Sequence, residues 1–132
     1  MSQFTKELFT QIMMSASFNS SIENIRTFPC CNIHAWLVNT GSTPPNGSFK
    51  LQASNENDLR INANQNANLV STYVTHFVDV ADSTVNIVAG QPNQVMWNIP
   101  DVGYTWIRCA YSASNASNAT ATARLQAKHG IP

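Results

Sequence analysis

The chain is 132 residues long and carries seven basic and seven acidic residues, so its formal net charge is zero. This length suits one domain that buries most of its apolar surface without disulfides or metals. The basic residues are scattered singly, whereas a phosphate-binding surface needs clustered Lys and Arg, so we expect no nucleic acid partner. No run approaches the roughly 20 apolar residues of a membrane span, so we expect no membrane contact.

The surface of the folded chain should be polar but poor in charge. Charged residues make up 11% of the sequence, while Asn, Ser and Thr contribute 16, 13 and 11 residues. Interface cores are depleted in charged residues, because charges lose their water on contact. Zero net charge also leaves little long-range repulsion between copies. The composition therefore favours a protein that assembles with copies of itself or with other proteins.

The N-terminal segment has apolar residues at the spacing of a helix. They recur every three to four residues, at Phe4, Leu8, Phe9, Ile12 and Met13. This spacing predicts an amphipathic helix of about three turns over residues 4–14. We assign residues 1–20 to an N-terminal helix or arm that either covers one end of the domain or docks on a neighbouring subunit. The segment lacks the pattern of a signal peptide, so we expect synthesis in a host cytoplasm.

Residues 21–132 are expected to form a single β-sandwich domain. The segment 22–28 alternates and ends before a proline, as an edge strand does. An apolar strand is expected over residues 31–38. The strand expected over residues 47–56 alternates so that one face carries Phe49, Leu51 and Ala53.

Two loops are candidate contact surfaces. The sequence GSTPPNG at residues 41–47 is turn chemistry and places Pro44 and Pro45 at a loop tip. Beyond it, asparagines occupy alternate positions at Asn62, Asn64, Asn66 and Asn68. Because Asn favours loops over strands, we expect a long exposed loop there. This loop is either solvated or laid across a partner as a hydrogen-bonding ribbon.

The second half of the chain predicts five further strands, over residues 70–80, 84–88, 95–99, 104–111 and 119–128. Arg108 lies in a largely aromatic row, so we expect its guanidinium to stack on Trp106 or to pair with Asp79 or Asp101. Seven or eight short strands separated by Gly, Pro and Asn turns predict an all-β fold, an antiparallel β-sandwich or jelly roll. Its core should contain Leu37, Phe49, Leu51, Trp97, Trp106 and Ile107.

The three cysteines do not predict a metal site. An odd number that includes an adjacent pair is typical of reduced, buried thiols. A zinc site would have to combine Cys30, Cys31, His34 and Cys109. Adjacent cysteines point to opposite faces of a strand, however, and the chain has no CxxC spacing. We therefore expect core packing for these thiols, with no metal and no cofactor.

Several segments resemble a family of small phage virion proteins. The matching residues are 39–41 (NTG), 47–55 (GSFKLQASN), 97–99 (WNI), 104–108 (YTWIR) and Tyr111. The resemblance extends over about residues 33–125 and departs from the family pattern after Asn55, where an Asn-rich stretch replaces a short hairpin. His76 or Phe77 stands there at a tryptophan position. The resemblance implies a sandwich or jelly-roll subunit of a capsid or tail, and it supplies no catalytic residues.

Catalytic motifs are missing from the sequence. The histidines, His34, His76 and His129, stand beside no nucleophile elbow, Gly-rich phosphate loop or HExxH motif. We therefore expect no enzymatic activity. A carbohydrate-binding sandwich is the competing non-enzymatic interpretation, because such modules stack sugar rings on exposed aromatic side chains. Its candidates are Trp36, Tyr73, Trp97, Tyr104, Trp106 and Tyr111.

These observations together predict a non-enzymatic structural protein of a phage virion. The favoured role is a capsid decoration or cement subunit. A tail or baseplate component is the alternative. The expected partners are the major capsid protein or another virion protein, and further copies of the chain, with a trimer implied by the resemblance. The candidate partner contacts are Phe4, Leu8, Phe9, Ile12, Pro44, Pro45, Asn62, Asn64, Asn66 and Asn68.

Overall fold

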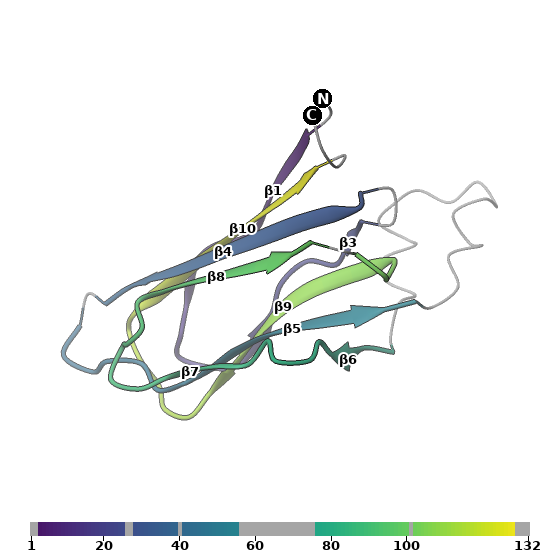
Figure 1. Ribbon diagram of the computed structural model, residues 1–132. Helices are drawn as coiled ribbons and strands as arrows, with labels where there is room; N and C mark the ends of the chain where they lie inside the picture. Colours follow the sequence, from purple (N-terminus) through teal and green to yellow (C-terminus); the bar gives the residue numbers. More distant parts are fainter. Residues whose placement is uncertain (1–2, 26–27, 40, 56–75, 101, 129–132) are drawn as a thin grey trace, which may run out of the picture.

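The computed structural model describes residues 3–25, 28–39, 41–55, 76–100 and 102–128. Over these residues the regular elements are all β-strands, arranged in two antiparallel sheets (Figure 1). The strands are β1 (Gln3–Met13), β2 (Phe18–Asn19), β3 (Glu23–Asn24), β4 (Cys30–Val38), β5 (Gly47–Ser54), β6 (Val78–Asp79), β7 (Val85–Ile87), β8 (Gln94–Ile99), β9 (Trp106–Ala113) and β10 (Thr120–Lys128). The predicted all-β fold is confirmed. Within the same ranges, no helix is long and apolar enough to cross a membrane.

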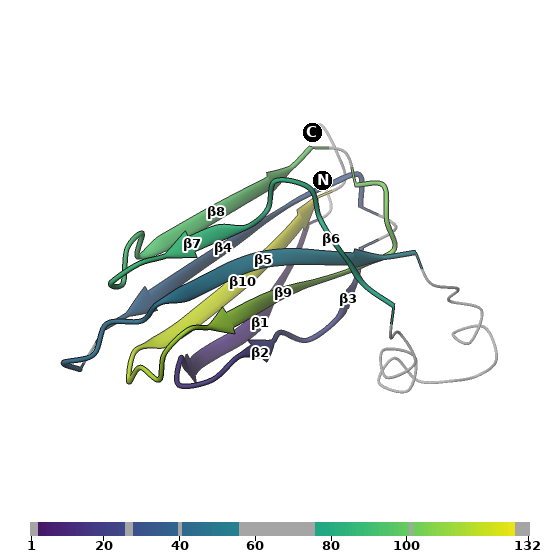
Figure 2. The same ribbon diagram turned by 90° about the horizontal axis from the view of Figure 1, so that it is seen from below.

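The chain folds back on itself as one long double ribbon. β1 pairs with β10, β2 and β3 pair with β9, β4 pairs with β8, and β5 pairs with β6 and β7. Successive pairs alternate between sheet A, in the order β1-β10-β4-β8, and sheet B, which contains β2-β9-β5-β6. The strand axes of the two sheets are roughly aligned with each other (Figure 2). A double ribbon wrapped in this way is a jelly roll.

The core fills the space between the sheets and follows the alternation in the sequence. Every second residue of β4 is buried, and on β10 the inward positions hold Ala121, Ala123, Leu125 and Ala127. These small side chains leave room for larger ones from sheet B, where the rings of Phe49 and Tyr111 lie 4.9 Å apart. All six residues expected in the core are buried, five of them between the sheets, whereas Trp106 is buried in a separate cluster on the outer side of sheet B.

The predicted N-terminal helix is wrong. Gln3–Met13 form strand β1, which pairs with β10 at the edge of sheet A. The register slips between Glu7 and Phe9 and again between Phe9 and Ile12. A bulge adds one residue to a strand, so side chains beyond it no longer follow simple alternation. Leu8 and Phe9 are therefore both buried, and the bulged strand has apolar residues at a spacing that resembles a helix.

Two other segments differ from their predicted lengths. The strand expected over residues 22–28 is reduced to β3, because the chain turns where the N–H of Phe28 donates to the carbonyl of Ile25. A strand is predicted over residues 70–80, and within the described residues of that segment the structure has the two-residue strand β6. Residues 1–20, which we assigned to a separate N-terminal segment, contribute β1 and β2 to the two sheets.

The loop at residues 41–47 is fastened by amide side chains. The N–H of Asn46 donates to Asn115 Oδ1 at 2.9 Å, and Asn115 Nδ2 donates to the carbonyl of Pro44 at 3.0 Å. At the end of the loop, a Cβ on Gly47 would collide with the backbone of the facing strand β9. The close approach of the two strands therefore requires glycine at this position.

Candidate functional site

The outer face of sheet A gathers side chains from all four of its strands. Because β4 alternates, His34 and Trp36 point away from the core. The antiparallel register places Arg124 of β10 opposite His34, and Gln94 of β8 opposite Trp36. Glu7 of β1 lies opposite Arg124. Pairing between distant parts of the chain therefore builds one continuous outer surface around Trp36.

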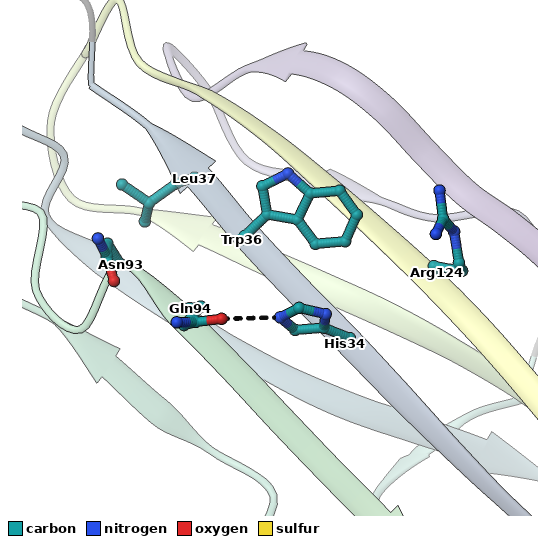
Figure 3. A pocket seen from close by; sticks show the side chains of 6 residues that line it. All are labelled: His34, Trp36, Leu37, Asn93, Gln94 and Arg124. Carbon is teal, nitrogen blue, oxygen red and sulfur yellow. Dashed lines mark hydrogen bonds between the residues drawn. The ribbon is translucent and has the colours of Figure 1, made fainter.

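A shallow depression of about 410 Å³ lies on this face, lined by His34, Trp36, Leu37, Asn93, Gln94 and Arg124 (Figure 3). His34 Nε2 lies 3.0 Å from Gln94 Oε1, at which distance the imidazole N–H donates to the amide oxygen. The His34 ring also lies 4.9 Å from the Trp36 ring, tilted by 47°. These contacts hold His34 in place, while the half-buried Trp36 ring extends along the sheet toward Arg124 (Figure 3).

The charge at this site is balanced by a pair on its rim. Arg124 Nη2 lies 2.7 Å from Glu7 Oε1, and the Arg124 Nε also donates to that oxygen at 3.2 Å. The guanidinium carbon is 5.7 Å from the centroid of the Trp36 ring. Both members of the ion pair are about half exposed, so the pair adds little to stability. Its effect is to orient the guanidinium beside the indole.

This arrangement is suited to binding rather than to acid–base chemistry. His34 is oriented by an amide instead of a carboxylate, and no hydroxyl or thiol side chain is among the residues that line the depression. In the part of the chain that the structure describes, no group of three or more His, Cys, Asp or Glu side chains could hold a metal ion. An indole flanked by an imidazole, amides and a guanidinium offers stacking and hydrogen bonds to a partner surface.

On the outer face of sheet B, in contrast, the charged side chains and Gln52 are bonded to one another. Arg108 Nε donates to Gln52 Oε1 at 2.8 Å, Gln52 Nε2 donates to Asp79 Oδ1 at 3.0 Å, and Lys50 Nζ lies 3.1 Å from the same carboxylate. The guanidinium of Arg108 also stacks on Phe77, 4.0 Å from the ring centroid. Arg108 is thus stacked as expected, but on Phe77, and it reaches the carboxylate of Asp79 through Gln52.

This network has electrostatic consequences. The hydrogen bond from Gln52 and then that from Lys50 lower the pKa of Asp79 below its ordinary value. Partial burial lowers the pKa of the Arg108 guanidinium. The groups of this face therefore act chiefly on one another.

The cysteines are free thiols, and Cys31 and Cys109 are buried as expected, whereas Cys30 is only partly buried. Burial, with a smaller contribution from Cys30, raises the pKa of Cys31 to about 11. Burial raises the pKa of Cys109 to about 12. Both thiols are therefore protonated at neutral pH and are poor nucleophiles.

The predicted partner contacts have different surroundings. Leu8 and Phe9 are buried in the core between the sheets, and Pro45 is buried as well. Ile12 is 39% exposed and Pro44 is half-buried. A role for any of them in partner binding stays a prediction.

The other predicted contacts are less fully placed. Phe4 lies in β1 opposite Ala127. The four alternating asparagines, Asn62, Asn64, Asn66 and Asn68, lie outside the described residues. Their role in binding a partner also stays a prediction.

Sequence reasoning found Trp36 but missed the group around it. The alternation of residues 31–38 already places His34 and Trp36 on one face of a strand. Arg124 and Gln94 are distant in sequence and reach the site through the register of β10 and β8. No local pattern indicates that register.

Comparison with known proteins identifies the fold and no family. No protein-family model matches the chain, and no curated protein matches it. The SPBc2 prophage-derived protein YomS has a similar structure, with a TM-score of 0.50 and 8% identity over 96% of this chain and 94% of that one. This likeness shows a shared fold.

Two further structures are more distant. The Yersinia pseudotuberculosis-derived mitogen has a TM-score of 0.44 and 9% identity over 99% of this chain and 87% of that one. A chain of Tomato aspermy virus has a TM-score of 0.39 and 11% identity over 99% of this chain and 78% of that one. At such scores neither likeness supports a conclusion about this chain.

Proposed function

We propose that this protein is a non-enzymatic structural subunit of a phage virion, located on the capsid as a decoration or cement subunit. The jelly-roll fold, which viral capsid domains use, supports this role. Further support comes from the fold shared with a prophage-derived protein and from the motif resemblance at residues 47–55 and 104–108. A tail or baseplate component is the second location compatible with the same observations.

The observation that carries the proposal is the character of the outer face of sheet A. Uncharged polar side chains surround Trp36 on neighbouring strands, and Arg124 is paired with Glu7. Such a face forms a broad contact without desolvating unpaired charges. Trp and Arg are also the residue types that most often dominate the energy of interfaces. We therefore assign the contact with the major capsid protein, or another virion protein, to this face.

The direct test is to look for the protein in particles purified from the phage that encodes it. Mass spectrometry should detect it at a copy number that is a simple ratio of the major capsid protein. Cryo-electron microscopy should show a two-layered β density on the particle exterior. Particles that lack the protein would refute the virion role, whereas density on the tail would move it to the second location.

Matched variants test the face. Replacing Trp36 with Ala removes the central aromatic side chain, and loss of such an anchor weakens binding about thirtyfold. Val78 on β6 is also apolar and is 71% exposed, but it lies on sheet B. The Trp36→Ala protein should fail to rebind particles that Val78→Ala still decorates. Equal binding by both variants would assign the contact to another surface.

Carbohydrate binding at the same depression is a second candidate function. It is favoured by one observation, the half-buried Trp36 ring bordered by amide groups at Asn93 and Gln94. Trp97 and Trp106 are buried, so a change of tryptophan fluorescence on adding a sugar would report on Trp36. Saturable quenching by an oligosaccharide, abolished in Trp36→Phe, would support this function. An unchanged spectrum across a glycan panel would exclude it.

A further inference from the structure

Among the strands that the structure describes, one long strand edge lacks the usual protection. In sheet B, the bordering strands β2, β3, β6 and β7 are only two or three residues long in the described chain. In sheet A, the border strand β1 is bulged twice and carries the charges of Lys6 and Glu7. Short length, bulges and charges are the usual devices that keep an edge from pairing with another chain. β8 at the opposite border has none of them: it has six residues, regular pairing and no charge (Figure 1).

The pairing of β8 with β4 determines which of its backbone groups face the free edge. The N–H of Leu37 donates to the carbonyl of Asn93 at 2.9 Å, so Asn93 is one of the residues whose backbone groups point toward β4. In an antiparallel ladder, alternate residues bond to the same neighbour. The residues bonded to β4 are Val95, Trp97 and Ile99, and those directed to the free edge are Gln94, Met96 and Asn98. Among the described residues, none of these last three takes part in any other backbone pairing.

We propose that β8 pairs edge to edge with β8 of a second copy of this chain, antiparallel, about a two-fold axis at Met96. This register sets Met96 opposite its own counterpart and Gln94 opposite Asn98, twice. Each facing pair exchanges two backbone hydrogen bonds, so about six are formed. The side chain of Met96 is 55% exposed in the single chain and would be covered by its counterpart. The amides of Gln94 and Asn98 would lie within reach of one another.

The strand itself selects a second copy as the partner. Two identical strands repel one another when they bear charge, and β8 bears none, so self-pairing opposes no like charges. The edge is also self-complementary, because Gln94 and Asn98 lie symmetrically about Met96. An isologous contact consumes both free edges, and the bulged, charged β1 does not extend the assembly. The product is a closed dimer in place of the trimer that the resemblance implied.

The test uses the purified full-length chain in solution, so its result is independent of the virion role. Sedimentation velocity should show a dimer for the wild type. Met96→Glu opposes two carboxylates at the axis and should weaken the dimer more than about 100-fold. Met96→Lys should do the same. Mixing the two variants opposes unlike charges, so a heterodimer should reappear.

Two controls separate pairing from folding. Val78→Lys adds a charge at an exposed apolar site on β6, away from β8, and should remain dimeric. Met96→Pro removes the N–H that faces the free edge but keeps the bonds to β4, so it should give a folded monomer with an unchanged far-ultraviolet spectrum. A wild-type monomer or trimer, or a Met96→Glu dimer of unchanged affinity, would overturn the pairing.

Discussion

Trp36 and Trp106 lie on the outer faces of the two sheets but have opposite surroundings. Each projects outward from a strand that has neighbours on both sides, β4 in sheet A and β9 in sheet B. Trp36 is half-buried in an open depression, whereas Trp106 is only 3% exposed and packs against Ile22 and Phe77. The two outer faces therefore differ around their tryptophans: distant segments of the chain cover Trp106 on sheet B, whereas Trp36 on sheet A stays partly open, as the proposed contact requires.

Removing each indole is the strongest way to break this comparison. Trp106→Ala should lower the free energy of unfolding by about 3–5 kcal/mol, as large-to-small substitutions at buried aromatic sites do. Trp36→Ala should cost less than about 1.5 kcal/mol, because the ring is only half-buried and lies beside the half-buried His34 and the exposed Arg124. Urea denaturation followed by circular dichroism measures both values. Equal losses would show that the two faces are equally closed.

Replacing the arginine of each face should give a smaller difference in stability, and the loss should again be larger on sheet B. Arg108→Gln removes a guanidinium that stacks on Phe77 and donates to Gln52, and should cost about 1–2 kcal/mol. Arg124→Gln breaks an exposed ion pair with Glu7 and should cost less than about 1 kcal/mol. Thermal unfolding of the two variants side by side tests this order. A larger loss for Arg124→Gln would contradict it.

The smallest expected effect is on the pH dependence of the protein's stability. The pKa of Asp79 is lowered in the folded protein, so its carboxylate contributes stability above its unfolded pKa of about 3.9. That contribution is lost as the pH falls through the folded pKa. Asp79→Asn should therefore differ from wild type slightly at pH 7 and not at all near pH 2. Nuclear magnetic resonance titration of the carboxyl should show its pKa rising toward the ordinary value in Gln52→Ala, and an unchanged pKa would contradict the role of Gln52.

The strands of the core could be predicted from the sequence because their alternation is regular. Phe49 and Leu51 on β5, and Ala121 and Leu125 on β10, are buried as their pattern indicates. The N-terminal strand could not be predicted, because the bulges of β1 depend on pairing with residues more than 100 positions away.

The candidate site could be predicted only in part. Alternation indicates that Trp36 faces outward, but the position of Arg124 beside it follows from the register of β10. Whether an outward tryptophan is covered, as Trp106 is, depends on the path of distant segments that carry Ile22 and Phe77.

Hydroxyl-radical footprinting of the protein, alone and mixed with phage particles, tests the proposed contact most directly. The reagent oxidises exposed aromatic, imidazole and thioether side chains. We predict that binding protects Trp36 and His34 on sheet A and leaves Phe77 on sheet B unchanged. Protection confined to sheet B, or oxidation of Trp36 at the same rate in the free and bound protein, would contradict a contact through the outer face of sheet A.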